Sequence, residues 1–370
     1  MKILVTGGAG FIGSHLVDAL LARSHEVVVY DSFSPQVHGS KRPSYLNCGA
    51  EYVKGDMRNR EALKKVLKSC EVVFHEAASV GVGQSMYQVL EYVGSNTQGT
   101  ALLLDLVVQE KTRVKKIVLA SSMSIYGEGC YHCAKCGKVS PPPRAREVME
   151  KKRWEMHCPH CKHLVKAIPT DESKPLEPTS IYAMTKRHQE EMALLIGKTY
   201  RLPVVALRYF NVYGPRQSLS NPYTGVCAIF TSRIKNRRSP LIYEDGLQSR
   251  DFVHVDDIVQ ANLLAMENPK ADFQAFNVGT GKGISILQIA NTLIHLYQKD
   301  VSPSIIEKYR AGDIRHCFSD ISKISALGYS PKRSLHDGLQ DLVEWGLSQK
   351  AADRTEAADR ELLKRGLRQT

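Results

Sequence analysis

The 370-residue sequence has no long apolar run. No stretch approaches the roughly 18 uninterrupted apolar residues that a membrane-spanning helix needs, and the run at residues 101–108 is broken by Asp105. At the N-terminus, Met1 and Lys2 precede a short β-branched segment that ends in glycines, without the small-residue cleavage site of a secretory signal. These absences argue against a membrane protein and predict a cytoplasmic one.

The sequence has fewer acidic than basic residues. Thirty-eight Asp and Glu face 50 Lys and Arg, which leaves a formal charge of +12. Such a balance favours anionic ligands such as phosphates, and by itself it leaves nucleic acid open. The hydrophobic share of 43% is that of an ordinary globular protein. The length suffices for two packed units, or for one large domain with additions.

The cysteines are too few and too clustered for a disulfide framework. Nine cysteines occur in the chain, and five of them fall within residues 130–161. Disulfide frameworks belong to small secreted chains, whereas local clustering in a long chain indicates metal binding.

Short β-branched segments alternate with helical patterns through the first 120 residues. Strands are expected at residues 2–6, 26–30, 51–54, 72–76 and 116–120, and helices at residues 12–23, 59–68 and 91–109. This order predicts an α/β fold with a doubly wound parallel Rossmann sheet.

Differences in composition and hydrophobic periodicity divide the chain into domains. Residues 1–128 and 170–217 are predicted to form the Rossmann domain, and residues 129–169 form a Cys-rich insert. Residues 218–345 are expected to be mainly a smaller substrate lobe, with some return to the Rossmann sheet. Residues 346–370 are charged and Ala-rich, so we expect a solvated or frayed helical tail.

A glycine pattern lies between the first strand and the first helix. Gly7 permits the tight turn, Gly10 lets the backbone approach a pyrophosphate, and Gly13 allows the helix to pack closely on the sheet. The helix N-terminus, at Phe11 and Ile12, then presents N–H groups to phosphates. A glycine turn without a ligand is the alternative.

Two carboxylates follow later strands of the same sheet. Asp31 lies at the end of the second strand, where it can accept hydrogen bonds from ribose hydroxyls and would repel a ribose phosphate. The cofactor is therefore predicted to be NAD. Asp56 follows the third strand and is placed for the adenine edge, or is a solvated loop carboxylate.

Tyr182 and Lys186 are four residues apart on one face of a predicted helix at residues 181–200. A nearby cation stabilises phenolate, so Lys186 is expected to lower the pKa of Tyr182 and let it act as a base. Ser121 and Ser122 end the strand at residues 116–120, at the sheet edge where open α/β sheets bind ligands.

With these motifs in place, the chain resembles the extended short-chain dehydrogenase/reductase family, specifically its nucleotide-sugar epimerases and dehydratases. The resemblance covers nearly all of the chain except residues 129–169 and the tail. It rests on Gly7-Gly8-Ala9-Gly10-Phe11-Ile12-Gly13, His75-Glu76-Ala77-Ala78, Asn96-Thr97-Gln98-Gly99-Thr100, Ser121-Ser122-Met123-Ser124-Ile125-Tyr126-Gly127, Tyr182-Ala183-Met184-Thr185-Lys186 and Arg208-Tyr209-Phe210-Asn211-Val212-Tyr213-Gly214-Pro215.

The resemblance implies roles for individual residues. It assigns Tyr182 as the base, Lys186 as its partner and nicotinamide-ribose ligand, and Ser122 as the hydroxyl that binds the sugar oxygen. Further cofactor contacts are implied at Met57, Ala77, Ala78 and Asn96, and substrate contacts at Ser124, Asn211, Asn221, Tyr223, Arg250, Arg310 and Asp313. Arginine suits phosphate because its planar fork matches the oxygens, although an intraprotein salt bridge is the alternative for either arginine.

The resemblance also implies a reaction. Proton removal from the C4 hydroxyl, with hydride uptake by NAD, gives a transient 4-keto sugar, and return of the hydride to its other face epimerises C4. The expected substrate is dTDP-L-rhamnose or a UDP-hexose. A 4,6-dehydratase would need an Asp-Glu pair where this chain has Met123 and Ser124. Decarboxylase and reductase chemistry remain open, as does a non-enzymatic NAD-binding sensor.

Two CxxC motifs mark the insert. Cys133, Cys136, Cys158 and Cys161 have the spacing of a zinc ribbon, in which two turns supply four thiolates to one structural metal. A redox dithiol and free thiols are the alternatives, and Cys130, His132, His157 and His163 lie close enough to replace a ligand. The insert joins the serine strand to the catalytic helix, so we expect it to brace or cap the substrate cleft.

Partners are expected to be few. The basic run at residues 144–153 would suit nucleic acid or a protein, but the rest of the chain is enzymatic in pattern, so nucleic acid is not expected. The family usually forms homodimers through helices that correspond to residues 91–109 and 181–200. A homodimer that binds a nucleotide-diphosphate sugar is therefore predicted. Burial of the apolar faces of these helices within the monomer is the alternative.

Overall fold

The largest element of the fold is a seven-stranded sheet. The structure, a computed structural model, describes residues 1–39, 41–310 and 312–368. All neighbouring strands of the sheet are parallel and follow the order β14-β9-β5-β4-β1-β2-β3. The strands are β1 (Lys2–Thr6), β2 (Glu26–Asp31), β3 (Glu51–Lys54), β4 (Val72–His75), β5 (Lys116–Ser122), β9 (Val204–Tyr209) and β14 (Gln274–Val278). The predicted doubly wound parallel sheet is confirmed.

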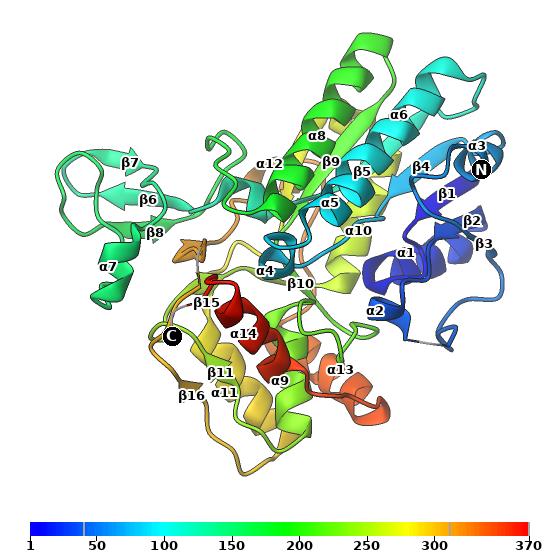
Figure 1. Cartoon of the computed structure of the whole chain (residues 1–370). Helices are drawn as coiled ribbons and strands as arrows, with labels where there is room; N and C mark the ends of the chain where they lie inside the picture. The colour runs from blue at the N-terminus through cyan, green and yellow to red at the C-terminus, as the bar shows by residue number, and fades with distance from the viewer. Residues whose placement is uncertain (40, 311, 369–370) are drawn as a thin grey trace.

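Helices cover both faces of this sheet (Figure 1). Ile3 and Val5 of β1 belong to one hydrophobic core, while Leu4 between them belongs to the other, because successive strand residues face opposite sides. The first core lies under α1 (Phe11–Ala22) and α10 (Val255–Glu267), and the second under α3 (Arg60–Leu67), α6 (Gly99–Gln109) and α8 (Ile181–Tyr200).

The helix expected at residues 91–109 is interrupted. It consists of α5 (Val89–Tyr92), a π-helical segment at Val93–Gln98 and α6. Asn96 in this segment turns its side chain to the loop at Ser79 and to Thr185 of α8, and the wider backbone turn accommodates those contacts. Composition alone does not predict that local change of helix type.

A second lobe lies beyond the sheet. Its core is formed by α9 (Val226–Lys235), α11 (Ile286–Tyr297) and α13 (Leu335–Ser348). Short pairings complete it: β10 (Asn211–Tyr213) with β13 (Phe252–His254), β11 (Leu241–Ile242) with β16 (Ser304–Ile305), and β12 (Ser249–Arg250) with β15 (Ile284–Ser285) and β17 (His316–Cys317). One-turn helices are α2 (Pro35–His38), α4 (Val82–Ser85) and α12 (Ser322–Ser325). The lobe faces the carboxyl ends of the large sheet.

The insert is a separate small module that projects from the body (Figure 1). It contains an antiparallel sheet of β7 (Gly137–Val139), β6 (Cys130–Cys133) and β8 (Lys166–Ile168). Along the chain, α7 (Arg146–Glu150) lies between β7 and β8. Its core is small and includes Tyr131, Val139 and Met156. So few apolar side chains provide little stability on their own.

The C-terminal tail differs from the expected solvated helix. Its described part, up to residue 368, contains α14 (Thr355–Lys364), whose Leu362 is only 6% exposed. The helix packs because Leu362 and its neighbours form an apolar edge along an otherwise charged segment. Among the described residues, no helix combines the length and apolarity needed to cross a membrane.

Candidate active site

A cavity of about 880 Å³ runs along the carboxyl ends of the large sheet and under the second lobe. Residues at or just after the ends of four strands line it: Gly7 after β1, Asp31 in β2, Glu76 after β4 and Ser122 in β5. This is the edge at which open α/β sheets bind ligands. The cavity size is that of an ordinary cofactor or substrate site.

The loop after β1 is shaped for close approach of a ligand. Gly7 has φ +69°, and a Cβ there would lie 2.8 Å from the Ala77 backbone. A Cβ on Gly13 would lie 2.4 Å from the Gly7 carbonyl oxygen, so only glycine lets α1 start this close to the sheet. Gly10, Phe11 and Ile12 line the cavity at the start of α1, where backbone N–H groups favour phosphate. The loop fits a dinucleotide.

Asp31 is held rigidly at the end of β2. Its carboxylate accepts the Ala9 N–H at 3.1 Å and the Phe33 N–H at 2.8 Å, and it lines the cavity. Asp56 also lines the cavity, but Arg58 binds its carboxylate at 2.6 Å and keeps its pKa below the usual range. The other predicted cofactor contacts that line the cavity are Met57, Ala77 and Ala78.

Asn96 is placed differently from the other predicted cofactor ligands. It is buried behind the cavity wall, where its amide donates to the Ser79 carbonyl at 3.1 Å and to the Thr185 hydroxyl at 3.0 Å. Its oxygen accepts the Ser79 N–H at 2.8 Å. Asn96 therefore fixes the loop that forms the cavity wall.

The two serines that end β5 point to different surroundings. Ser121 donates to Glu190 at 2.6 Å inside the protein. The Ser122 oxygen lines the cavity and accepts the Ser124 N–H at 3.2 Å and the Ser124 hydroxyl at 2.9 Å. Because these contacts fill the acceptor positions of Ser122, its own proton is available to donate into the cavity.

Tyr182 and Lys186 project into the same cavity from the first turns of α8. Ser180 caps this helix by accepting the Ala183 N–H at 3.1 Å. The Tyr182 N–H donates to Ser85 at 3.0 Å. The Lys186 ammonium donates to the Ala120 carbonyl at 2.7 Å, so it is fixed against the end of β5.

The sequence predicts that Lys186 lowers the pKa of Tyr182, but other groups set that pKa in the structure. Burial raises the pKa of Tyr182, and a hydrogen bond with Ser122 opposes that rise. Burial lowers the pKa of Lys186 to about 8, against the charge of Glu76. In the structure Ser122 therefore counters the pKa rise of Tyr182, whereas the charge of Lys186 acts on Glu76 and lowers the pKa of that carboxyl.

Glu76 is a partly buried ionisable residue of the cavity wall, and the sequence motifs predict no role for it. Its carboxylate accepts the Tyr209 hydroxyl at 2.8 Å, and burial raises its pKa to about 7. An ionisable side chain directly after a buried strand, at the ligand-binding edge, was the available signal. Tyr209 in turn accepts a hydrogen bond from Asn262 at 2.7 Å.

Predicted substrate contacts line the far end of the cavity. The Arg250 guanidinium donates to the Ile314 carbonyl at 2.7 Å, and Arg310 binds Asp313 at 3.1 Å while its guanidinium lies 4.4 Å from the centre of the Tyr243 ring. The salt-bridge alternative is therefore present for Arg310. The predicted contacts that line the cavity are Ser122, Ser124, Asn211, Asn221, Tyr223, Arg250, Arg310 and Asp313.

Asn221 and Asn211 differ in their hydrogen bonding at the cavity wall. The Asn221 oxygen accepts the Tyr223 N–H at 3.1 Å, which shapes the loop, and the Tyr223 hydroxyl lies 2.7 Å from that of Tyr87. The buried Asn211 Oδ1 has no hydrogen-bond partner among the described residues. Such an atom at a cavity wall is suited to a polar ligand.

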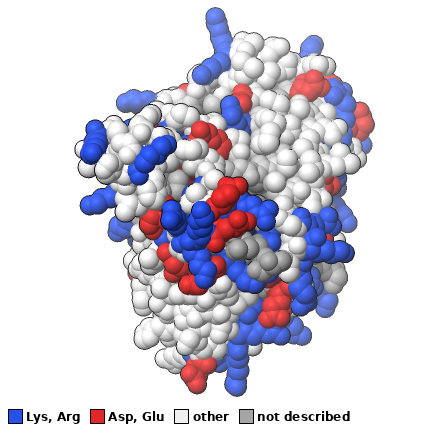
Figure 2. Space-filling model, turned by 60° about the vertical axis from the view of Figure 1, so that its left-hand side comes forward, with Lys and Arg blue, Asp and Glu red and all other residues white. Residues whose placement is uncertain are grey.

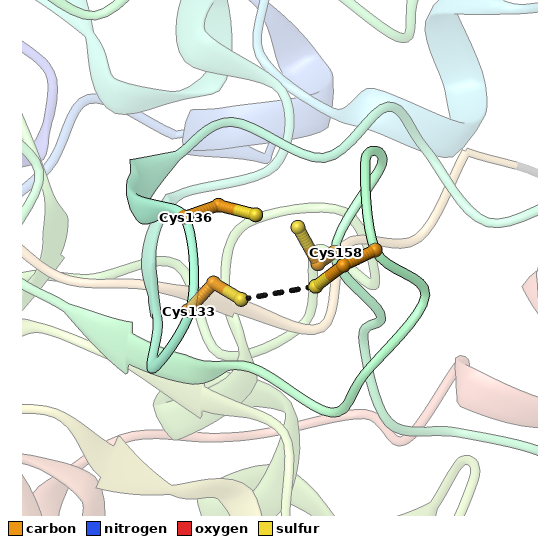
Figure 3. Close-up of side chains that lie close together, drawn as sticks. Cys133, Cys136 and Cys158 are labelled. Atoms are coloured by element: carbon orange, nitrogen blue, oxygen red, sulfur yellow. Dashed lines mark hydrogen bonds between the residues drawn. The ribbon is translucent and has the colours of Figure 1, made fainter.

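The four cysteines of the two CxxC motifs come together in the insert. Their sulfur atoms all lie within 4.8 Å of one another, and Figure 3 shows Cys133, Cys136 and Cys158 pointing inward, with the 3.4 Å contact from Cys133 to Cys161 dashed. Backbone N–H groups of Cys161 and His160 lower the pKa of the Cys158 thiol to about 6. Cys130 lies apart and is buried, with its N–H bound to Thr170 at 3.0 Å.

The insert is tied to the wall of the cavity by two ion pairs, one buried and one half-exposed. Arg144 binds Glu244 at 2.7 Å and donates to the Asp313 carbonyl at 3.2 Å. Glu155 of the insert binds Arg315 at 2.5 Å, and Arg315 also reaches Glu244 at 3.0 Å. The segment that carries Arg310 and Asp313 is thus attached to the insert on one side and to the second lobe on the other.

A parallel sheet with a dinucleotide loop, and a Ser, Tyr and Lys at its carboxyl edge, define a nucleotide-cofactor enzyme of the short-chain dehydrogenase/reductase type. The NAD dependent epimerase/dehydratase family matches residues 3–147 and 159–279. The chain belongs to this family.

Relatives with established names share most of its length. A dTDP-L-rhamnose 4-epimerase of Burkholderia thailandensis is 36% identical over 93% of this chain and 94% of its own. The UDP-glucose 4-epimerase of Thermotoga maritima, solved with UDP-glucose, has a TM-score of 0.77 and 34% identity over 93% of this chain and 98% of its own. The UDP-glucuronic acid 4-epimerase of Bacillus cereus, solved with UDP-glucuronic acid and NAD, has a TM-score of 0.77 and 30% identity over 94% and 99%.

Proposed function

We propose that this protein is an NAD-dependent nucleotide-sugar 4-epimerase that acts through a transient 4-keto sugar. The observation that carries the proposal is that Ser122, Tyr182 and Lys186 line one cavity together with the glycine loop and with Arg250 and Arg310. One cavity could therefore hold the cofactor, the sugar and the diphosphate next to the catalytic groups. Three relatives with this fold are 4-epimerases.

The chain supplies acid, base and orientation. In its phenolate form Tyr182 would accept the proton of the C4 hydroxyl and become a phenol, and Ser122 would donate a hydrogen bond to the same sugar oxygen. The glycine loop, Asp31 and Lys186 would hold NAD, whose chemistry would be reversible acceptance of hydride from C4. Lys186 holds a positive charge at the cofactor side, and the arginines keep the diphosphate in place while the keto sugar turns. Tyr182 then returns the proton to the C4 oxygen.

The substrate we favour is dTDP-L-rhamnose, with a UDP-hexose as the second candidate. The identity of 36% to a dTDP-L-rhamnose 4-epimerase supports the first, and the structural likeness to a UDP-glucose 4-epimerase supports the second. Both substrates share the diphosphate that Arg250 and Arg310 would bind.

The variant Tyr182→Phe tests the proposal. It keeps the ring that packs edge-on to Tyr92 at 6.5 Å between centroids but removes the proton acceptor. We expect epimerase turnover to fall by about 10³-fold or more, while bound NAD, measured after denaturation, stays at the wild-type level. Wild-type-like turnover in this variant would contradict the role of Tyr182. NAD binding without any turnover in the wild type would favour the sensor.

We also propose that the four cysteines of the insert bind one structural zinc. Tetrahedral ligands about 2.3 Å from the metal lie about 3.8 Å apart, so sulfur atoms gathered within 4.8 Å need only a small movement to bind it. Zinc would stabilise a module with little core of its own and so brace the segment of Arg310 and Asp313. In Figure 2, basic and acidic side chains are interspersed on the face that carries the insert, which does not favour nucleic acid.

A cytoplasmic homodimer completes the proposal. Apolar side chains are exposed along α4, α5 and α8, including Leu90 at 85% and Leu195 at 65%. A patch of this kind on neighbouring helices suits a second copy of the chain. The cytoplasm is proposed because a zinc site built from four thiolates persists where thiols stay reduced.

A further inference from the structure

The C-terminal helix α14 contributes side chains to the cavity wall, and appears in red between α4 and α9 in Figure 1. The segment before it is anchored to the second lobe, because Asp353 and Arg233 form a buried ion pair at 3.2 Å. The helix itself is anchored by Asp359, which accepts a hydrogen bond from the Tyr243 hydroxyl. The tail is therefore a packed element of the second lobe.

On its other side, α14 reaches the Rossmann domain. Leu362 packs against Gly83 of α4, where a Cβ on the glycine would lie 3.2 Å from the leucine side chain. The Arg365 guanidinium lies 4.4 Å from the centre of the Tyr87 ring. Since these contacts and those of Asp359 are on opposite lobes, α14 spans the opening of the cleft.

The helix also forms part of the cavity wall itself. Ala358, Asp359, Leu362 and Leu367 line the same cavity as Arg310. Asp359 pairs with Arg368 at 3.0 Å, and Arg368 forms a backbone bridge with Arg310. The residue that we propose as a diphosphate ligand is therefore held in part by the tail.

We propose that α14 is the outer wall of the nucleotide subsite and that Leu362 contacts a bound nucleoside diphosphate. The proposal rests on the function proposed above, since it concerns the nucleotide end of the same cleft. Leu362 is already packed on Gly83 and is only 6% exposed, so it presents a preformed apolar wall that excludes water from the nucleoside. The helix therefore contributes to affinity for the nucleotide and leaves the chemical step to Ser122, Tyr182 and Lys186.

Calorimetric titration of the full-length holoenzyme with dTDP and with UDP tests this role. Leu362→Ala removes the packing of α14 on Gly83, and a chain that ends at Arg354 keeps the Asp353 anchor but removes the whole helix. Because either change withdraws support from the cavity wall and from Arg310, each should raise the Kd of the nucleotide that binds by about tenfold. Arg365→Ala removes the contact with Tyr87 and an exposed ion pair with Glu361 within α14, and it should raise the Kd about two- to threefold. Arg360→Ala, an exposed residue of the same helix, is the control and should leave the Kd unchanged.

Each other outcome is informative. Unchanged affinity in Leu362→Ala and in the shortened chain, with normal NAD content, would overturn the proposal. Tighter binding by the shortened chain would also overturn it, since α14 would then obstruct the subsite. If the full-length holoenzyme binds neither dTDP nor UDP, the proposed function itself fails, and the role of α14 fails with it.

Discussion

Glu76 shows how burial changes the chemistry of a single residue. Its carboxyl lies next to the catalytic centre, where burial raises its pKa to about 7, against the hydrogen bond from Tyr209 and the charge of Lys186. In the unfolded chain the same group ionises near pH 4.3. Between these values the folded state binds more protons than the unfolded state, so stability is lost as the pH rises.

Glu76→Gln removes this titration. We expect the variant to gain stability relative to the wild type as the pH rises from 5 to 8, because the wild type must ionise a buried carboxyl over that range and the variant does not. Thermal unfolding of both holoenzymes at several pH values measures the difference. Glu147→Gln, at an exposed carboxyl of α7, is the control. A stability difference between Glu76→Gln and wild type that stays constant with pH would contradict the account.

Residues in the motifs were predictable from the sequence, and residues placed by tertiary packing were not. Gly7, Asp31, Ser122 and Tyr182 each follow a strand end or begin a helix, so the chain order alone brings them to one edge. Asn96 belongs to a motif, but only the structure shows that its amide faces the Ser79 loop. The sequence could not show whether the Asn96 side chain binds the protein or a ligand, because the π-helical turn that directs it toward Ser79 is not predictable from the sequence.

At the scale of elements, the insert is the module that depends most on a ligand. The four sulfurs are within 4.8 Å, and the apolar core beside them is small. The spacing of the CxxC motifs predicted which cysteines gather. It could not predict where the module docks, because Arg144, Glu155, Glu244 and Arg315 are far apart in the sequence and pair only in the folded chain.

Cys158→Ser is expected to lose the metal and loosen the brace. We expect about one zinc per wild-type chain by elemental analysis, a clear fall in the variant, and a lower unfolding temperature. KM for the nucleotide sugar should rise because the segment of Arg310 loses its support, while NAD content stays unchanged.

Cys48→Ser, an exposed cysteine outside the insert, is the matched control. Wild-type protein that contains no zinc under metal-replete expression would contradict the metal site. Loss of zinc with unchanged KM would contradict the brace.

Elements that carry a strong periodic pattern were predicted closely, whereas for the tail a helix was expected but its packing was not. The helix at Ile181–Tyr200 has the predicted bounds, because Ser180 caps it and apolar residues recur along one face. The tail has few apolar residues, so its pattern indicated solvent exposure. Its packing depends on partners such as Gly83 and Tyr243, which lie in other parts of the chain.

At the scale of the whole molecule, the exposed apolar patch on α4, α5 and α8 predicts a dimer. A charge at Leu90 would place an unpaired carboxylate in that interface, so Leu90→Glu should shift the sedimentation coefficient from dimer to monomer. Leu347→Glu, on the second lobe and 63% exposed, is the control that should remain dimeric. A wild-type protein that sediments as a monomer at micromolar concentration would refute the prediction.

The central claim is that the whole cleft performs a self-contained epimerisation at C4. The most direct measurement follows dTDP-L-rhamnose and UDP-glucose by NMR in D₂O, each incubated separately with purified protein and no added cofactor. We predict that one of them yields its C4 epimer with the original hydrogen retained at C4 and without net NADH. Release of carbon dioxide from UDP-glucuronate in a parallel sample, deuterium at C4, or a stable keto product with one equivalent of NADH would contradict the claim.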